Sequence, residues 1–176
     1  YRPILGVDFY NTASYVGSLS RDFAFRFNGW KYNWWGGMPM HLDYPSLHAY
    51  LNLPLLSFFS LPQAVQFYML FTCFLFLFFS YLLFTEIGKD RVLAAILALA
   101  SSFSIALYGA LVWGGSLPYF ATQFFLPLTL WCLVKFFNTK NVRWFFLSSL
   151  FLGISFFVLP QVVLCFLIRI SFFLLL

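Results

Sequence analysis

Residues 63–84 form an uninterrupted apolar run of 22 residues that contains no charged side chain. A helix needs about 20 such residues to cross the hydrocarbon core of a bilayer. The run begins like a helix, with Ser60 as the cap, Pro62 in the first turn and Gln63 three residues after the cap. It therefore predicts a membrane-spanning helix that ends near the polar residues 86–91.

The composition of the whole chain points to the same class of protein. Hydrophobic residues make up 62% of the chain and charged residues 9%, whereas a soluble domain carries about 25% charged residues. A water-soluble fold of this size could not bury so much apolar surface. We predict an all-α integral membrane protein, with an outer-face loop over residues 1–60 and a transmembrane helical bundle over residues 61–176.

Further apolar segments follow the first run and predict four to five transmembrane helices in total. Small residues in the second segment would let neighbouring helices approach closely, and Pro127 predicts a kink in the third. The fourth and fifth segments could equally form one kinked helix. The predicted spans are Gln63–Phe84, Val92–Val112, Leu117–Phe137, Trp144–Pro160 and an incomplete segment from Gln161 onward.

Basic residues indicate how these spans are oriented. Lysines and arginines occur in and beside the predicted loops 86–91 and 138–143, whereas the turn at 113–116 has none. Loops rich in lysine and arginine remain in the cytoplasm. This bias predicts that residues 1–60 face outward, on the side opposite the two basic loops.

The outer-face loop shows two short helical patterns. Residues 9–23 carry Thr12, Val16, Leu19 and Phe23 at helical spacing, which predicts an amphipathic helix lying in the membrane interface. A second short helix is predicted over residues 44–51. The intervening stretch is rich in glycine and proline and is predicted to be a loop.

Two compositional details bear on chain organisation. The three cysteines, Cys73, Cys132 and Cys165, all lie in apolar stretches and are interpreted as small buried hydrophobic residues. The chain has no initiator methionine and stops within an apolar run. We therefore expect it to be truncated at both ends, with further spans on either side in the complete protein.

Few residues of the chain could carry out chemistry. Asp8 precedes the first predicted helix, so its carboxylate could cap the amides of that helix, or it could be a catalytic group at the outer membrane face. His41, Asp43 and His48 lie close together in sequence. A divalent metal bound there is possible, but no recognisable ligand spacing supports it.

The outer-face loop carries Gly6-Val7-Asp8 followed by the predicted amphipathic helix, then Gly37-Met38-Pro39, and then Tyr44-Pro45 leading into the second short helix. These motifs resemble those of multi-spanning glycosyltransferases of the GT-C fold. The segment "YGALVWGGSLPYFATQFFLPLTLWCL" is similar to the second outer turn of that family. The resemblance covers most of the chain, through short motifs.

The resemblance implies transfer of a sugar from a polyprenyl-phosphate carrier to a glycan or lipid acceptor at the outer face of the cell membrane. Asp8 would be the base that takes a proton from the acceptor hydroxyl. Cationic groups would stabilise the leaving lipid phosphate. The candidates for contact with the substrates are Arg21, Arg26, Lys31, Trp34, Trp35, His41, Asp43, Tyr44 and His48.

Two alternatives to an active enzyme stay open at this stage. A histidine that the family often carries one turn after the aspartate is replaced here by Asn11 and Thr12, which fits a non-catalytic subunit or an inactive relative. A transporter segment is the other alternative, although charges within the predicted spans are nearly absent. The lipid bilayer is an expected partner in every case, and no basic run fits a nucleic acid.

Overall fold

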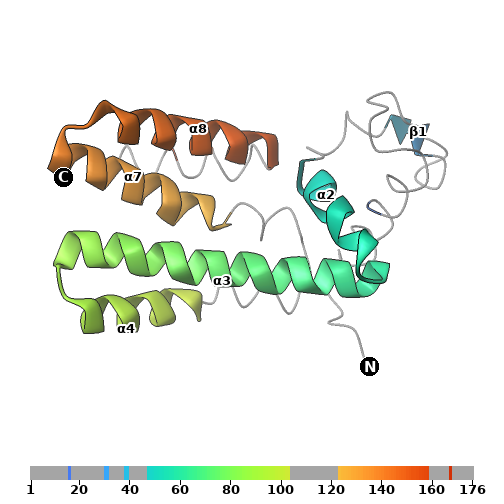
Figure 1. Ribbon diagram of the computed structural model, residues 1–176, viewed down its shortest axis with the longest axis horizontal. Coiled ribbons are helices and arrows are strands. Elements are labelled where there is room, and N and C mark those ends of the chain that lie inside the picture. The colour runs from blue at the N-terminus through green and yellow to red at the C-terminus, as the bar shows by residue number, and fades with distance from the viewer. Residues whose placement is uncertain are drawn as a thin grey trace.

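The computed structural model describes residues 16, 30–31, 38–39, 47–103, 123–158 and 167. The described chain is built mainly of helices, which confirms the all-α prediction. Four helices lie side by side in the order α4, α3, α7 and α8, with α3–α4, α3–α7 and α7–α8 as the packed pairs (Figure 1). The α3–α4 turn and the α7–α8 turn lie at the same end of this array, and α2 lies at the opposite end.

Helix α3 spans Leu61–Gly88, 28 residues, and so contains the whole of the predicted span 63–84. The predicted start is confirmed: both the backbone N–H and the hydroxyl of Ser60 donate to Gln63 Oε1, at 3.1 Å and 2.7 Å. The helix ends at Lys89, which adopts the left-handed conformation at a φ of 57°. The helix therefore extends beyond the apolar run at both ends.

Helix α4, Arg91–Ser102, folds back along α3. The Asp90 carboxylate caps it by accepting hydrogen bonds from the backbone N–H groups of Val92 and Leu93, at 2.8 Å and 3.1 Å. Ala94 and Ala98 are buried, whereas Ala100 is exposed. The predicted close approach is thus confirmed for the two alanines one helical turn apart. The rest of the predicted span 92–112 lies outside the described residues from 104 onward.

Helices α7, Phe125–Thr139, and α8, Val142–Val158, form a second antiparallel hairpin. Gln123 is helical and Phe124 is a turn residue, so the helical path is interrupted just before α7. Pro127 falls in the first turn of α7, where its missing N–H leaves no hydrogen bond unmade. Helix α8 agrees closely with the predicted span 144–160, and the predicted fifth span lies outside the described residues apart from Leu167.

The described parts of residues 1–60 differ from the prediction in one respect. The stretch predicted to be entirely loop contains two short strands, β1 (Trp30–Lys31) and β2 (Met38–Pro39), which pair antiparallel. The second predicted helix is confirmed as α2, Leu47–Asn52, followed by the 3-10 helix η1, Leu53–Ser57. Val16, from the predicted interfacial helix, is helical and fully buried. The boundary at residue 60 stays a prediction.

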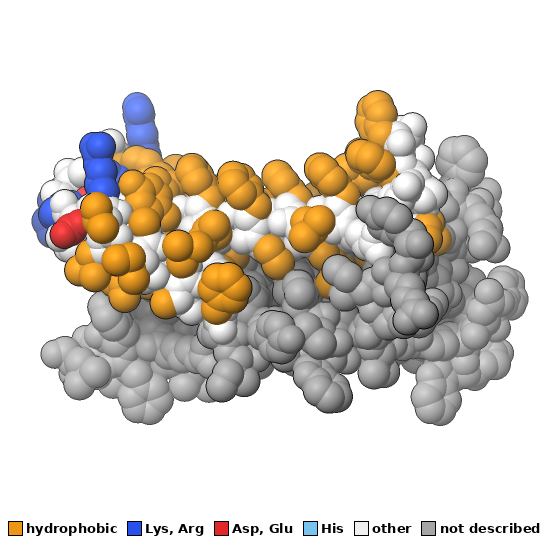
Figure 2. All heavy atoms as spheres, turned by 90° about the horizontal axis from the view of Figure 1, so that it is seen from below, with side chains coloured by type: hydrophobic (Ala, Val, Ile, Leu, Met, Phe, Trp, Pro, Cys, Tyr) orange, Lys and Arg blue, Asp and Glu red, His pale blue; other side chains and the backbone are white. Residues whose placement is uncertain are grey.

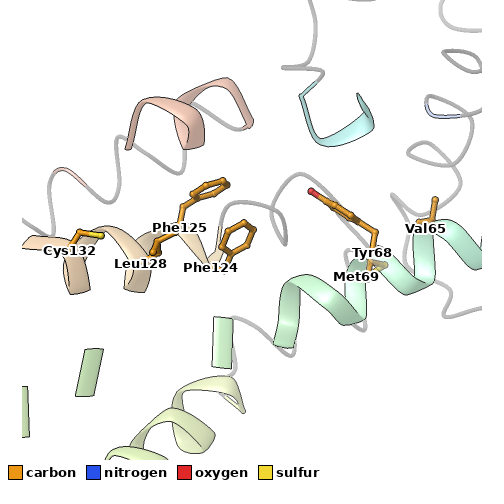
Figure 3. Packing of buried hydrophobic residues seen from close by; sticks show 7 residues of the cluster. All are labelled: Val65, Tyr68, Met69, Phe124, Phe125, Leu128 and Cys132. Carbon is orange, nitrogen blue, oxygen red and sulfur yellow. The ribbon is translucent and has the colours of Figure 1, made fainter. Parts of the chain in front are cut away.

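A cluster of apolar side chains joins the two hairpins. It consists of Val65, Tyr68 and Met69 from α3 and of Phe124, Phe125, Leu128 and Cys132 at and within α7 (Figure 3). Cys132 is fully buried and Cys73 is half-buried, both as free thiols, which agrees with their interpretation as small apolar residues. Residue Cys165 lies outside the described part of the chain.

Much of the remaining apolar surface is exposed. On α3, Leu70 is 63% exposed and Phe74 is 58% exposed, and further large apolar side chains are exposed on α4 and α8. Figure 2 shows apolar side chains along the described face of the molecule, with charged side chains gathered at one end. Among the described residues, α3 is the one helix long and apolar enough to cross a membrane.

Candidate functional site

The described residues form a concave feature between the two helical hairpins. It is an apolar groove of about 970 Å³, which is within the size range of pockets that bind small molecules. Helices α3, α7 and α8 form its walls, and α2 with η1 lies at one end. The described residues that line it are Leu51, Pro54, Leu55, Phe67, Tyr68, Phe71, Thr72, Leu75, Phe79, Phe124, Phe125, Leu128, Trp131, Cys132, Trp144, Leu147, Phe151 and Ile154.

Aromatic rings from α3, from α8 and from the start and body of α7 make up half of the residues that line this apolar groove. Phe79 of α3 stacks on Phe124 at 6.3 Å, and Phe124 stacks on Phe125 at 4.2 Å. Trp131 and Trp144 meet edge to face at 5.3 Å where α7 and α8 approach each other. Such aromatic pairs stabilise one another beyond the area that they bury, so the walls of the groove are formed by interacting rings.

Polar groups in the apolar groove are few. The Thr72 hydroxyl donates to the carbonyl oxygen of Met69 at 2.9 Å, within its own helix. Tyr68 is 6% exposed, and Figure 3 shows its ring extending from α3 toward Phe124 and Phe125. A surface of this kind fits a hydrocarbon chain far better than a sugar or a nucleotide, because it offers almost no hydrogen bonds to polar atoms.

The end of the array that holds the two turns has the opposite character. In segments 47–103 and 123–158, all seven charged residues lie within 86–91 and 135–143. The α3–α4 and α7–α8 turns, which contain the two predicted basic loops, lie at the same end of the array of helices (Figure 1). We call residues 86–91 and 135–143 together the charged end.

Glu86 connects the two hairpins at the charged end. Its Oε2 atom is 2.7 Å from Lys135 Nζ of α7, and its Oε1 atom is 3.0 Å from Lys89 Nζ. The side-chain amide of Asn138 donates to Oε1 at 2.7 Å. Glu86 lies beyond the apolar run 63–84, where its side chain remains 14% exposed. The contacts with Lys135 and Asn138 hold the ends of α3 and α7 together.

These donors also control the ionisation of Glu86. The hydrogen bond from Lys135 holds the pKa of the Glu86 carboxyl well below its usual range, at about 2. Partial burial opposes this effect, and the hydrogen bonds from Asn138 and Lys89 add to it. The carboxylate therefore stays ionised at any pH at which the protein would function.

The residues predicted from sequence to contact substrate lie mainly outside the described part of the chain. This holds for Asp8, Arg21, Arg26, Trp34, Trp35, His41, Asp43 and Tyr44. Lys31 lies in β1 and His48 in α2, and only the backbone of each is described. These roles stay predictions. Among the described residues, no cluster of three or more potential metal ligands occurs.

The sequence-based reasoning missed both the apolar groove and the Glu86 contacts. Most of the groove residues lie within segments assigned to membrane spans, and their aromatic content gave no indication of which face of each helix would line a groove. The pairing of Glu86 with Lys135 had a detectable signal, since the charge pattern had already assigned both residues to the same side of the membrane.

Comparison with known proteins adds no further constraint. No protein-family model matches the sequence, and no curated protein or solved structure is significantly similar to it. The function has to be inferred from the residues and their arrangement.

The Glu86 contacts predict how stability depends on pH. Because the pKa of Glu86 is lower in the folded protein than the value of about 4.3 expected in the unfolded chain, its stabilising contribution is complete above the unfolded value. The contribution is lost as the pH falls toward about 2. Glu86→Gln should lower the free energy of unfolding by about 1 kcal/mol at neutral pH, and this difference from wild type should shrink below the unfolded pKa.

Thermal unfolding of the protein in detergent, followed by circular dichroism across this pH range, measures the effect. Asp90→Asn is the matched control, because asparagine also caps helices and Asp90 makes no ion pair with a described residue. A Glu86→Gln protein as stable as wild type at neutral pH would contradict the proposed link between α3 and α7.

Proposed function

We propose that the chain is an integral membrane protein in which α3 crosses the bilayer and the neighbouring helices belong to a bundle of four to five spans. The support is the exposure of large apolar side chains on α3, α4 and α8 together with the absence of charge from residues 63–84. Exposed apolar surface of this extent is unfavourable in water but not in lipid. The charged end faces the cytoplasm in this proposal, and residues 1–60 face outward.

Within this membrane protein, we propose that the apolar groove holds the hydrocarbon chain of a polyprenyl-phosphate sugar, whose sugar is transferred to an acceptor at the outer face. The observation that carries this proposal is the groove itself, about 970 Å³ in volume with an almost wholly apolar, aromatic lining. The groove ends against α2 and η1. A chain bound there would direct its phosphate toward residues 1–60.

The chemistry assigned to residues 1–60 follows from their resemblance to the GT-C glycosyltransferases. Asp8 would accept the proton of the acceptor hydroxyl while the hydroxyl oxygen forms a bond to the anomeric carbon of the sugar. The bond between that carbon and the phosphate oxygen breaks, and the polyprenyl phosphate leaves as an anion. Arg21, Arg26 and Lys31 are the cations proposed to stabilise this leaving group.

A non-catalytic lipid-binding subunit is the second candidate function. The apolar groove favours it as well, because binding a hydrocarbon chain requires no catalytic group. A transporter segment is less well supported: in segments 47–103 and 123–158 the charges lie at one end of the helices, whereas ion-coupled transporters carry ionisable groups within their spans.

The enzyme and the lipid-binding subunit are distinguished by Asp8→Asn. If Asp8 is the general base, this change should lower sugar transfer by a factor of about 100 or more while leaving insertion into the membrane unchanged. The measurement is transfer of radiolabelled sugar from polyprenyl phosphate in membranes that contain the full chain.

Asp22→Asn removes an acid from the same outer segment and should keep wild-type transfer. Full activity in the Asp8→Asn protein would exclude the proposed base. Absence of transfer from the wild-type protein, combined with binding of polyprenyl phosphate, would favour the non-catalytic subunit.

The apolar groove is tested by filling it. Leu147 of α8 lines the groove and is 36% exposed, whereas Leu150, one turn later, is 55% exposed and is not part of the lining. Leu147→Trp should weaken the binding of polyprenyl phosphate by roughly tenfold or more, because a bulky ring would occupy space that the chain needs.

Leu150→Trp is the matched control, with the same substitution on the same helix, and should bind polyprenyl phosphate as wild type does. Binding can be measured by thermophoresis of the labelled protein in detergent, after circular dichroism has shown that both variants keep their helical content. Equal affinity in the two variants would place the lipid chain elsewhere.

A further inference from the structure

Three cations at the charged end remain without an acidic partner after the described ion pairs are assigned. Glu86 is shared by Lys135 and Lys89. The carboxylate of Asp90 accepts hydrogen bonds from the backbone of α4. Arg91, Lys140 and Arg143 are exposed and form no ion pair with a described residue.

One of these cations occupies a position that the helix dipole disfavours. Arg91 and Arg143 lie in the first turns of α4 and α8, and neither first turn contains an acidic residue, but the capping carboxylate of Asp90 lies at the start of α4. The amino-terminal end of a helix carries partial positive charge, so a cation there is repelled and an anion is attracted. The residue before α8 is the neutral Asn141, whose side-chain oxygen accepts the backbone N–H of Arg143 at 3.1 Å. An external anion would relieve this repulsion.

The cations also lie directly beside apolar surface. Lys140 Nζ is 5.9 Å from the centre of the Phe137 ring, and Phe137, Phe145 and Phe146 are all exposed. The Trp131–Trp144 pair lies in the adjoining part of α7 and α8, and tryptophan favours the headgroup level of a bilayer. In a membrane, the tryptophan pair would lie at the headgroup level, and the cations beside it would lie at the depth of the lipid phosphates.

We propose that Arg91 on one hairpin, and Lys140 and Arg143 on the other, bind the phosphate groups of anionic lipids in the leaflet that the charged end faces. This inference rests on the membrane insertion proposed above and is independent of sugar transfer. The partner is a lipid headgroup and not a free anion, because the adjoining apolar surface would contact the acyl chains. Each basic residue near an anionic bilayer strengthens attachment by about fivefold.

The test uses the full chain reconstituted in phosphatidylcholine bilayers that contain a trace of spin-labelled lipid. Electron paramagnetic resonance separates lipids held at the protein from free lipids, which gives the association constant of phosphatidylglycerol relative to phosphatidylcholine. We expect wild type to prefer phosphatidylglycerol several-fold. The triple variant R91Q/K140Q/R143Q should show a ratio near one.

The control R2Q removes a cation of the outer segment that has no proposed role in substrate binding, and it should keep the preference. Inorganic phosphate, compared with chloride at the same ionic strength, should not displace the lipid. Three results would each overturn the inference. The preference could be lost in the control only, it could persist in the triple variant, or inorganic phosphate could displace the lipid. A wild-type protein that integrates into the bilayer without any lipid preference would overturn this inference alone, whereas failure to integrate would overturn the proposed function as well.

Discussion

Helix α3 carries apolar side chains on all of its sides, and its neighbours cover only part of them. Helix α4 packs closely on one side through Ala94 and Ala98, and α7 packs on another side through Phe125 and Leu128. The apolar side chains between these contacts remain exposed or line the groove. The other helices therefore cover only part of α3, and the rest of its apolar surface is left for a different contact.

The same constraint explains the distribution of polar groups. Residues 63–84 carry no charge, and among the described residues the ion pairs lie where the helices end, with Glu86 meeting Lys135 there. The two hairpins are thus fixed to each other at the charged end. Toward α2 and η1 the apolar cluster also joins them, and the apolar groove lies beside that cluster. This combination of a fixed end and an open, apolar region is what the proposed lipid-chain site requires.

The sequence predicted those features that depend on local pattern. The start of α3 at Ser60 and Gln63, the approach of α4 through small residues and the position of α8 all follow from motifs within a few residues. The β1–β2 pair was missed because a two-residue ladder leaves almost no periodic signal. The groove was missed for a different reason, since an apolar face looks the same in sequence whether a helix, a ligand or lipid covers it.

In the candidate site, too, local sequence pattern predicted some features and not others. Asp8 and the cations near it were identified from their residue types and from a family resemblance, and their roles remain predictions. The contact between Glu86 and Lys135 joins residues on different hairpins, so its geometry depends on the order in which the helices pack. Charge patterning predicted that both residues lie at one end but could not predict that they touch.

The central claim is that the exposed apolar face of α3 is in contact with lipid. A spin label at Phe74, in the middle of α3, tests it most directly, in a variant whose three cysteines are replaced by alanine. In bilayers, the label at Phe74 should collide with oxygen far more often than with a water-soluble nickel complex. A label at Lys140 should collide more often with the nickel complex than with oxygen. A Phe74 label that collides readily with the nickel complex, or with neither reagent, would contradict the account.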